Sequence, residues 1–122
     1  MKSPNPIAAA SFNTVSALLR EHALARPDHP AVQDETQSLN YAQLDALVDR
    51  IATSLQRDGV HHGDVVAICA LNSARYAAVF LGVLRAGAAV APLAPSSTSE
   101  TLASMLRDCG AKLWFADASA DV

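Results

Sequence analysis

Residues 64–93 read DVVAICALNSARYAAVFLGVLRAGAAVAPL, and this stretch decides the fold of the chain. Its first part, Val65–Leu71, is an unbroken apolar run, which is typical of a strand covered on both faces. After the polar pair Asn72-Ser73, apolar residues recur at helical spacing as far as about Arg85. The remaining segment, Ala88–Leu93, predicts a second buried strand.

The helix between these strands has recognisable ends. Asn72 or Ser73 can cap its N-terminus, and Gly87 ends it. We expect four apolar residues on its inner face: Ala77, Phe80, Leu81 and Leu84. The apolar run Tyr76–Leu93 contains Arg85, Gly87 and Pro92, so it predicts a buried helix followed by a strand and not a membrane span.

Towards the C-terminus, the segment Ser97–Glu100 resembles a capping box that opens another helix, which Gly110 closes. Its inner face is expected to carry Leu102, Met105, Leu106 and Cys109. Leu113–Phe115 predicts a third strand. The order of strands and helices from residue 64 implies right-handed crossovers and an α/β fold with a parallel sheet flanked by helices. Because such sheets are normally extended by further strands, we expect this one to be unfinished.

Towards the N-terminus, residues 1–12 are expected to form a flexible leader. Asn13 or Thr14 can cap a helix that runs to about Arg26, before Pro27. Two short strands, Ala31–Gln33 and Ser38–Leu39, are expected around a polar turn.

The strongest helix signal begins at Asn40, which can form a capping box with Gln43, and Gly59 is expected to close this helix. Six apolar residues define one face of it: Tyr41, Leu44, Leu47, Val48, Ile51 and Leu55.

The composition excludes several classes of protein. Of the 122 residues, 51% are hydrophobic and 17% charged, a balance that excludes a wholly disordered chain. The formal net charge is -3 with scattered Lys and Arg, so the chain has no electrostatic footprint for nucleic acid. Cys69 and Cys109 form no CxxC pair, which favours buried thiols and a reducing cytoplasm over a disulfide framework.

Three segments, in this order, resemble the adenylate-forming superfamily of acyl-CoA synthetases, luciferases and peptide-synthetase adenylation domains. Leu39–Leu44 (LNYAQL) resembles the early motif L-[ST]-Y-x-E-L, and Gly63–Ile68 followed by Asn72 resembles G-D-x-V-A-[IL] with its downstream Asn. Leu84–Leu93 is similar to L-[KR]-A-G-[AG]-x-x-x-P-[LI]. The resemblance covers roughly residues 14–117 and implies that residues 13–122 are an incomplete N-terminal portion of an AMP-binding domain.

The resemblance implies a parent enzyme that activates a carboxylic acid with ATP and Mg and passes the acyl group to a thiol such as CoA. The family's phosphate loop, acidic metal contact, ribose aspartate and catalytic lysine all lie downstream of the matched motifs. We therefore expect no catalytic, cofactor-binding or metal-binding residue here, no tight binding of ATP, Mg or CoA, and no activity of this chain alone. The expected partners are the remainder of the parent chain and its carboxylic acid substrate, without nucleic acid or a membrane span.

Two branches of the family remain open for the parent enzyme, together with a third reading. Val90–Pro95 lacks the Tyr and Asp of the peptide-synthetase motif Tyr-Val-Pro-Leu-Asp-Pro, which favours a carboxylic acid:CoA ligase over an amino-acid adenylation domain. Ser96 stands where some CoA ligases carry a basic residue, which leaves the thiol acceptor undecided. The third reading is a truncated, non-catalytic binding or assembly module that associates through unpaired sheet edges. A generic dinucleotide-binding domain is disfavoured because G-x-G-x-x-G is missing.

Several residues that invite a functional role have a simpler structural one. Ser96–Ser99 lacks the glycines of a phosphate loop, so helix capping is expected. His61-His62 is expected to be a solvated loop pair, and Asn72 a helix cap. The remaining expectations are solvated carboxylates at Asp64 and Asp117, a core position for Trp114, and C-terminal helix positions for Arg85 and Arg107.

Overall fold

Three parallel strands form the central sheet of the computed structural model, which describes residues 14–120. They are β3 (Val65–Cys69), β4 (Ala89–Leu93) and β5 (Ala111–Ala116), in the spatial order β4-β3-β5. β3 pairs in register with β4 from Val65↔Ala89 to Cys69↔Leu93, and β5 lies on its other side. The predicted parallel sheet is therefore confirmed.

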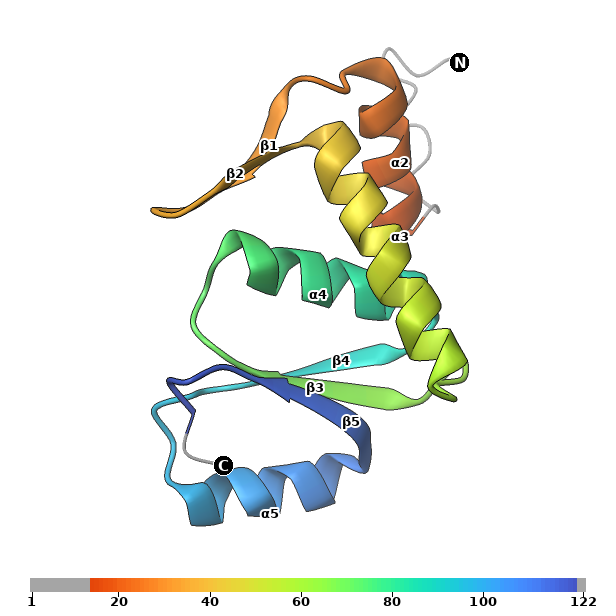
Figure 1. Ribbon diagram of the computed structural model, residues 1–122. Helices are drawn as coiled ribbons and strands as arrows, with labels where there is room; N and C mark the ends of the chain where they lie inside the picture. The colour runs from red at the N-terminus through yellow and green to blue at the C-terminus, as the bar shows by residue number, and fades with distance from the viewer. Residues whose placement is uncertain (1–13, 121–122) are drawn as a thin grey trace, which may run out of the picture.

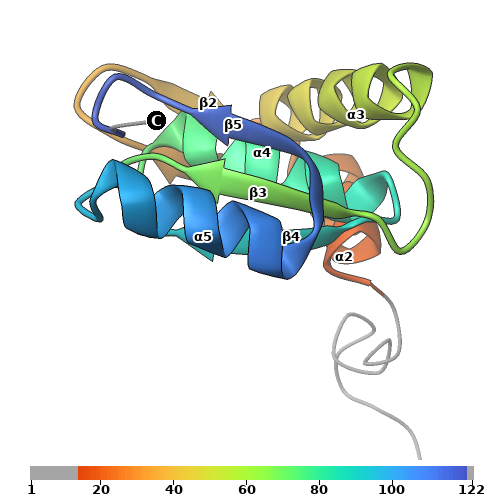
Figure 2. The same cartoon turned by 90° about the horizontal axis from the view of Figure 1, so that it is seen from below.

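Helices cover both faces of this sheet. α4 (Ala74–Arg85) joins β3 to β4 and lies on one face, and α5 (Ser99–Cys109) joins β4 to β5 and lies on the other (Figures 1 and 2). The chain steps from β3 to β4 in one direction and then back across β3 to reach β5. Right-handed crossovers that run in opposite directions place their helices on opposite faces, which accounts for this arrangement.

The N-terminal elements form a further layer on α4 (Figure 1). α2 (Val15–Ala25) is capped by Thr14, and β1 (Pro30–Gln33) pairs antiparallel with β2 (Ser38–Asn40). α3 (Tyr41–Arg57) begins with the predicted capping box. The Asn40 Oδ1 atom accepts a hydrogen bond from the Gln43 amide at 2.8 Å, and Gln43 Oε1 accepts one from the Asn40 amide at 2.9 Å.

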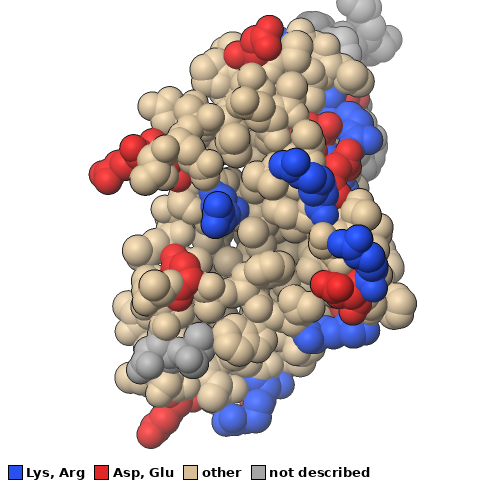
Figure 3. Space-filling view, viewed as in Figure 1, with Lys and Arg blue, Asp and Glu red and all other residues tan. Residues whose placement is uncertain are grey.

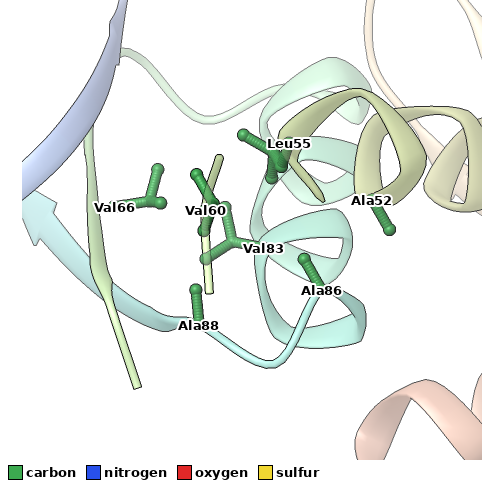
Figure 4. Close-up of a cluster of buried hydrophobic side chains, with 7 residues drawn as sticks. All are labelled: Ala52, Leu55, Val60, Val66, Val83, Ala86 and Ala88. Atoms are coloured by element: carbon green, nitrogen blue, oxygen red, sulfur yellow. The ribbon is translucent and has the colours of Figure 1, made fainter. Parts of the chain in front are cut away.

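Two apolar clusters hold these layers together. The first lies between α3, α4 and the start of the sheet (Figure 4) and contains Ala52, Leu55, Val60, Val66, Val83, Ala86 and Ala88. The second joins α2, α3 and α4 through Leu19, Leu44, Val48 and Ala78. Gly82 of α4 directly faces Ile51 of α3, so the two helices approach closely at this point.

The structure corrects the predicted end of β3 and the predicted burial of β4. β3 ends at Cys69, two residues earlier than expected, and Leu71 is 61% exposed because the chain turns there towards α4. β4 is partly exposed instead of buried, since only β3 pairs with it within residues 14–120.

The predicted inner face of α4 is also wrong in part. The fully buried residues are Ala74, Ala78, Gly82 and Val83, and the four predicted ones are only partly buried. α4 lies between the sheet and α3, and small residues let both layers approach it closely.

α5 differs from prediction at its cap and on its inner face. It is capped by Thr98, whose side chain accepts from the Thr101 amide, and not by a box of Ser97 and Glu100. Leu102 is fully buried, whereas Met105 is 38% exposed.

The predicted leader lies outside the described residues. No helix formed by residues 14–120 combines the length and the apolar character needed to cross a bilayer.

Candidate functional site

The carboxyl ends of the parallel strands are the place where α/β sheets usually hold ligands. Beside the ends of β3 and β5 lies a cavity of about 230 Å³. Its walls are mainly apolar and include Ile68, Val79 and Phe115, and Tyr76 and Asp117 also line it. A second, more polar hollow adjoins it and is lined by the loops around Asp34, Asn72 and Asp117.

Asp34 joins the β1–β2 turn to the N-terminus of α4. One carboxylate oxygen accepts from the Ala74 amide at 2.8 Å, and the other accepts from the amides of Thr36 and Gln37, each at 2.8 Å. These hydrogen bonds, led by that of Ala74, lower the pKa of Asp34 to about 2. A carboxylate with this many donors stays charged and holds the two loops together.

Asp117 makes a similar connection at the end of β5. Its side chain accepts from the hydroxyl and amide of Ser119 and, at 3.0 Å, from the Leu71 amide. The Ser119 hydroxyl is the main cause of the lowered pKa of Asp117, followed by the Leu71 amide. Asp117 therefore ties the loop after β3 to the loop after β5, which corrects the expectation of a merely solvated carboxylate.

Side chains of this chain already occupy amides at the N-terminus of α4. The first amide of α4 already donates to the Asp34 carboxylate, and Ser73 accepts from the Tyr76 amide at 3.0 Å. A phosphate placed at this helix N-terminus would meet a fixed negative charge and few unused donors. Residues 14–120 contain no group of three His, Cys, Asp or Glu side chains that could hold a metal ion.

A partly buried ionic cluster lies at the other end of α4, where the sequence predicted only a favourable dipole position. The Arg85 side chain is 11% exposed, and its Nη2 atom lies 2.7 Å from Asp45 Oδ1 and 2.9 Å from the Ser16 carbonyl oxygen. Its Nη1 atom donates to Asp49 at 3.1 Å, and Arg20 donates to the same Asp49 oxygen at 2.7 Å. Asp45 Oδ1 accepts no directed hydrogen bond, so charge attraction holds this pair. The cluster ties α2, α3 and α4 together.

The other predicted residues are placed as follows. His61 and His62 are exposed in their turn, as expected. The helix cap is Ser73 and not Asn72, which is exposed beside the polar hollow. Thr98 confirms the capping role of the Ser96–Ser99 segment. Arg107 is exposed in the last turn of α5.

The structure corrects the predictions of a solvated carboxylate at Asp64 and of a core position for Trp114. Asp64 accepts from the His61 amide at 2.7 Å and lies 3.3 Å from Lys112 Nζ, and the His61 hydrogen bond is the main reason for its lowered pKa. Trp114 is 45% exposed on the edge strand β5, where it alternates with Leu113 and Phe115, which pack on the α3–α4 side of the sheet. Two sequence signals could have indicated the roles of the ionic cluster and of Asp34. Asp45 and Asp49 stand four residues apart on one face of a helix, and Asp34 followed by Thr36 is the pattern of an Asx turn.

Charges on the surface do not form a nucleic-acid footprint on the face drawn in Figure 3, where basic and acidic side chains are interspersed. Cys69 is buried, burial raises the pKa of its thiol, and both cysteines are free.

Both the sequence and the fold of this chain resemble those of known proteins. The family model described as AMP-binding enzyme matches residues 19–122. A linear gramicidin synthase polypeptide of Brevibacillus parabrevis is 40% identical over 96 residues, which are 79% of this chain and 2% of that protein. Surfactin synthase subunit 3 of Bacillus subtilis (strain 168) is 36% identical over 106 residues, 87% of this chain and 8% of that protein.

Two solved structures resemble this chain along most of its length. The N-terminal domain of FACL13 from Mycobacterium tuberculosis superimposes with a TM-score of 0.80 and 30% identity, over 85% of this chain and 27% of that one. The Klebsiella oxytoca NpsA N-terminal subdomain gives a TM-score of 0.81 at 24% identity, over 88% of this chain and 28% of that one, a likeness of fold alone. The chain thus spans a small part of each protein that it resembles.

Proposed function

This chain belongs to the family of AMP-binding enzymes, and from that premise we propose that it is the N-terminal portion of an adenylate-forming enzyme. The family match confirms the resemblance predicted from the three sequence motifs. In this proposal residues 13–122 contribute scaffold to the AMP-binding domain. The observation that carries it is the superposition on the FACL13 N-terminal domain, at 30% identity over 85% of this chain.

The reaction of the whole enzyme has two steps. A substrate carboxylate attacks the α-phosphorus of ATP, so that pyrophosphate leaves and an acyl-adenylate forms. A thiolate then attacks the acyl carbon, and AMP leaves. Both steps need charge neutralisation around phosphate, and in this proposal the groups that bind ATP and Mg come from elsewhere in the enzyme.

The contribution of this chain is positional. Asp34 and Asp117 hold three loops at the carboxyl edge of the sheet, and the Arg85 cluster fixes α4 against α2 and α3. A misplacement of about 1 Å far from the reacting atoms can cost about 100-fold in rate. The proposed role is therefore to hold the strand ends in place while groups from elsewhere in the enzyme perform the chemistry.

Two thiol acceptors are each favoured by one observation. Identities of 40% and 36% to the gramicidin and surfactin synthases support an amino-acid adenylation domain, whose acceptor is a carrier-protein thiol. Val90–Pro95, which lacks the Tyr and Asp of the peptide-synthetase motif, supports a carboxylic acid:CoA ligase. The free thiols of Cys69 and Cys109 support a cytoplasmic enzyme in either case.

A graft tests the proposal. Residues 19–120 would replace the corresponding segment of the Mycobacterium tuberculosis fatty acyl CoA synthetase, to which this chain is 30% identical with a TM-score of 0.81. We expect the graft to release pyrophosphate from ATP in the presence of a fatty acid, and the isolated chain to release none. The control is the recipient without the segment. A folded graft without activity, or activity of the isolated chain, would refute the scaffold role.

A parallel graft into an adenylation domain of surfactin synthase subunit 3 separates the two branches. This recipient is 36% identical to the chain over 106 residues. Higher retained activity in this recipient supports the carrier-protein branch, and higher retained activity in the acyl-CoA synthetase supports the CoA branch. Each value is expressed relative to the corresponding native recipient.

A further inference from the structure

The cavity at the carboxyl edge of the sheet has the form of a small-molecule site. It has a volume of about 230 Å³ and lies where the start of α4 meets the ends of β3 and β5, which are on the same side of the molecule (Figure 1). Small-molecule sites are usually concave and mostly apolar, with a few polar groups that orient the ligand. This cavity has both kinds of lining.

The apolar lining sets the size of the ligand body. Two aromatic side chains, Tyr76 of α4 and Phe115 of β5, line the cavity together with Ile68 and Val79. The Tyr76 ring stacks on Phe80 with ring centroids 6.4 Å apart, which limits its movement. An apolar cavity of about 150 Å³ accepts benzene. This larger cavity therefore has room for a six-membered ring that carries a short side arm.

Arg75 supplies a positive charge to the same cavity. It lies in the first turn of α4, where a cation is unfavourable because it opposes the helix dipole. The ion pairs formed by residues 14–120 do not include Arg75. The Asp34 carboxylate accepts from the neighbouring Ala74 amide, but Asp34 does not line the cavity. A residue that breaks a local preference in this way is commonly found at a functional site.

Asp117 supplies a negative charge from the end of β5. Its Oδ1 atom accepts from the Ser119 amide and hydroxyl, and its Oδ2 atom accepts from the Leu71 amide at 3.0 Å. A carboxylate has about four acceptor positions, so these hydrogen bonds leave a position on Oδ2. Arg75 and Asp117, both among the described residues, form no ion pair with each other. The cavity therefore presents two separate and opposite charges to a ligand.

We infer that this cavity binds an α-amino acid with an apolar side chain. The carboxylate of the amino acid pairs with Arg75, its ammonium group pairs with Asp117, and its side chain enters the apolar cavity. A simple carboxylic acid would bring a like charge to Asp117, and a simple amine would do the same at Arg75. The inference goes beyond the proposed function, because it places a ligand site in the scaffold itself, formed by this chain alone.

Amide shifts in two-dimensional NMR spectra of the whole chain test the inference with three probes. L-Phenylalanine carries both charged groups, 3-phenylpropanoate lacks the ammonium group, and 2-phenylethylamine lacks the carboxylate. L-Phenylalanine should shift the amides of Ile68, Tyr76 and Phe115 in a saturable manner. Each incomplete probe should bind at least about tenfold more weakly, because it loses one charge-assisted contact and leaves one charge of the cavity unpaired.

Two variants locate the ligand, and circular dichroism checks that each variant is folded. Arg75→Gln should weaken the binding of L-phenylalanine at least about tenfold and should not weaken that of 2-phenylethylamine. Ala70→Leu enlarges a side chain that lines the cavity, so it should weaken the binding of all the probes. Arg107→Gln, at an exposed position of α5, is the matched control and should weaken none of them.

The fatty acyl CoA synthetase graft shows whether the cavity stays open in a whole enzyme. L-Phenylalanine should bind to the graft as it binds to the chain, and Arg75→Gln in the graft should weaken this binding to the same extent. Pyrophosphate release with a fatty acid, measured on the same graft, reports on the proposed function separately, since either measurement can fail without the other.

Four results would overturn the inference. Absence of saturable shifts up to the solubility limit of L-phenylalanine would show that the cavity takes no such ligand. Equal affinities for the probes would show that the two charges do not take part. An unchanged affinity in Arg75→Gln would place the ligand elsewhere on the chain. Loss of binding in the graft would mean that another part of the enzyme fills the cavity.

Discussion

Gly82 is the residue whose replacement gives the sharpest test of how α3 and α4 pack. A Cβ atom added at Gly82 would lie 2.4 Å from Ile51 Cγ2 and 2.8 Å from Ile51 Cβ, with the Val48 carbonyl oxygen at 3.5 Å. Rotation of the Ile51 side chain can move Cγ2 but not Cβ. The Gly82→Ala variant therefore requires the two helices to separate.

Two opposing terms set the size of this effect. Alanine in place of glycine inside a helix stabilises it by about 1 kcal/mol. Overpacking at a close contact costs about 1–3 kcal/mol, and the immovable Cβ contact places Gly82→Ala at the upper end. We expect a net loss of about 1–2 kcal/mol in the free energy of unfolding, opposite in sign to the helix propensity.

Urea unfolding followed by far-ultraviolet circular dichroism measures this loss. The matched control is Ala103→Gly at an exposed position of α5, which reports the propensity difference alone and should cost about 1 kcal/mol. Ile51→Ala removes Cγ2, so the double variant with Gly82→Ala should be more stable than the sum of the single variants predicts, by about 1 kcal/mol. A stabilising effect of Gly82→Ala would show that the helices are not in this close contact.

Three further predictions concern charge and exposure. Arg85→Met should cost about 2 kcal/mol because Asp45 loses its nearer cation and keeps only the more exposed Arg20, whose Nε atom lies 3.5 Å away, and Asp45→Leu in the same chain should recover part of this loss. The exposed Arg107→Met, as a control in the same urea assay, should change stability by less than about 0.5 kcal/mol. The pKa of Asp34 is about 2 in the folded chain and about 3.9 in an unfolded one, so its carboxylate stabilises the fold above about pH 4 and loses this effect as the pH falls towards 2. In urea midpoints measured against pH, Asp34→Asn should flatten this acid limb, and an unchanged limb would count against the hydrogen bonds of Asp34. Because Trp114 is 45% exposed, iodide should quench its fluorescence in the isolated native chain nearly as well as in the unfolded chain, and strong shielding would contradict its outward position.

Residues close together in the sequence could be interpreted without the tertiary structure. The capping box of Asn40 and Gln43 and the left-handed backbone at Gly87 and Gly110 depend on bonds within a few residues. The α/β class also followed from local patterns, because alternating strands and helices with short connections leave few topologies. The three family motifs could be recognised for the same reason, since each is a contiguous segment.

The cap of α5 shows the limit of such local signals. Ser97 and Thr98 are adjacent, and both residue types favour the N-cap position. In the structure Thr98 caps α5. In the same way Ser73, and not its neighbour Asn72, caps the N-terminus of α4.

Contacts between distant segments were decided only by the tertiary structure. Arg85 and Asp45 lie forty residues apart, as do Asp34 and Ala74, and no local pattern states that they meet. The exposure of Trp114 depends on its place in an edge strand and on the face of the sheet that it takes, which residue type does not determine. Sequence alone thus determined which segments are helices and strands and to which family they belong, because those signals are short-range. The loops tied together by Asp34 and Asp117 and the ionic cluster of Arg85 required packing in three dimensions, because each depends on groups that folding brings together.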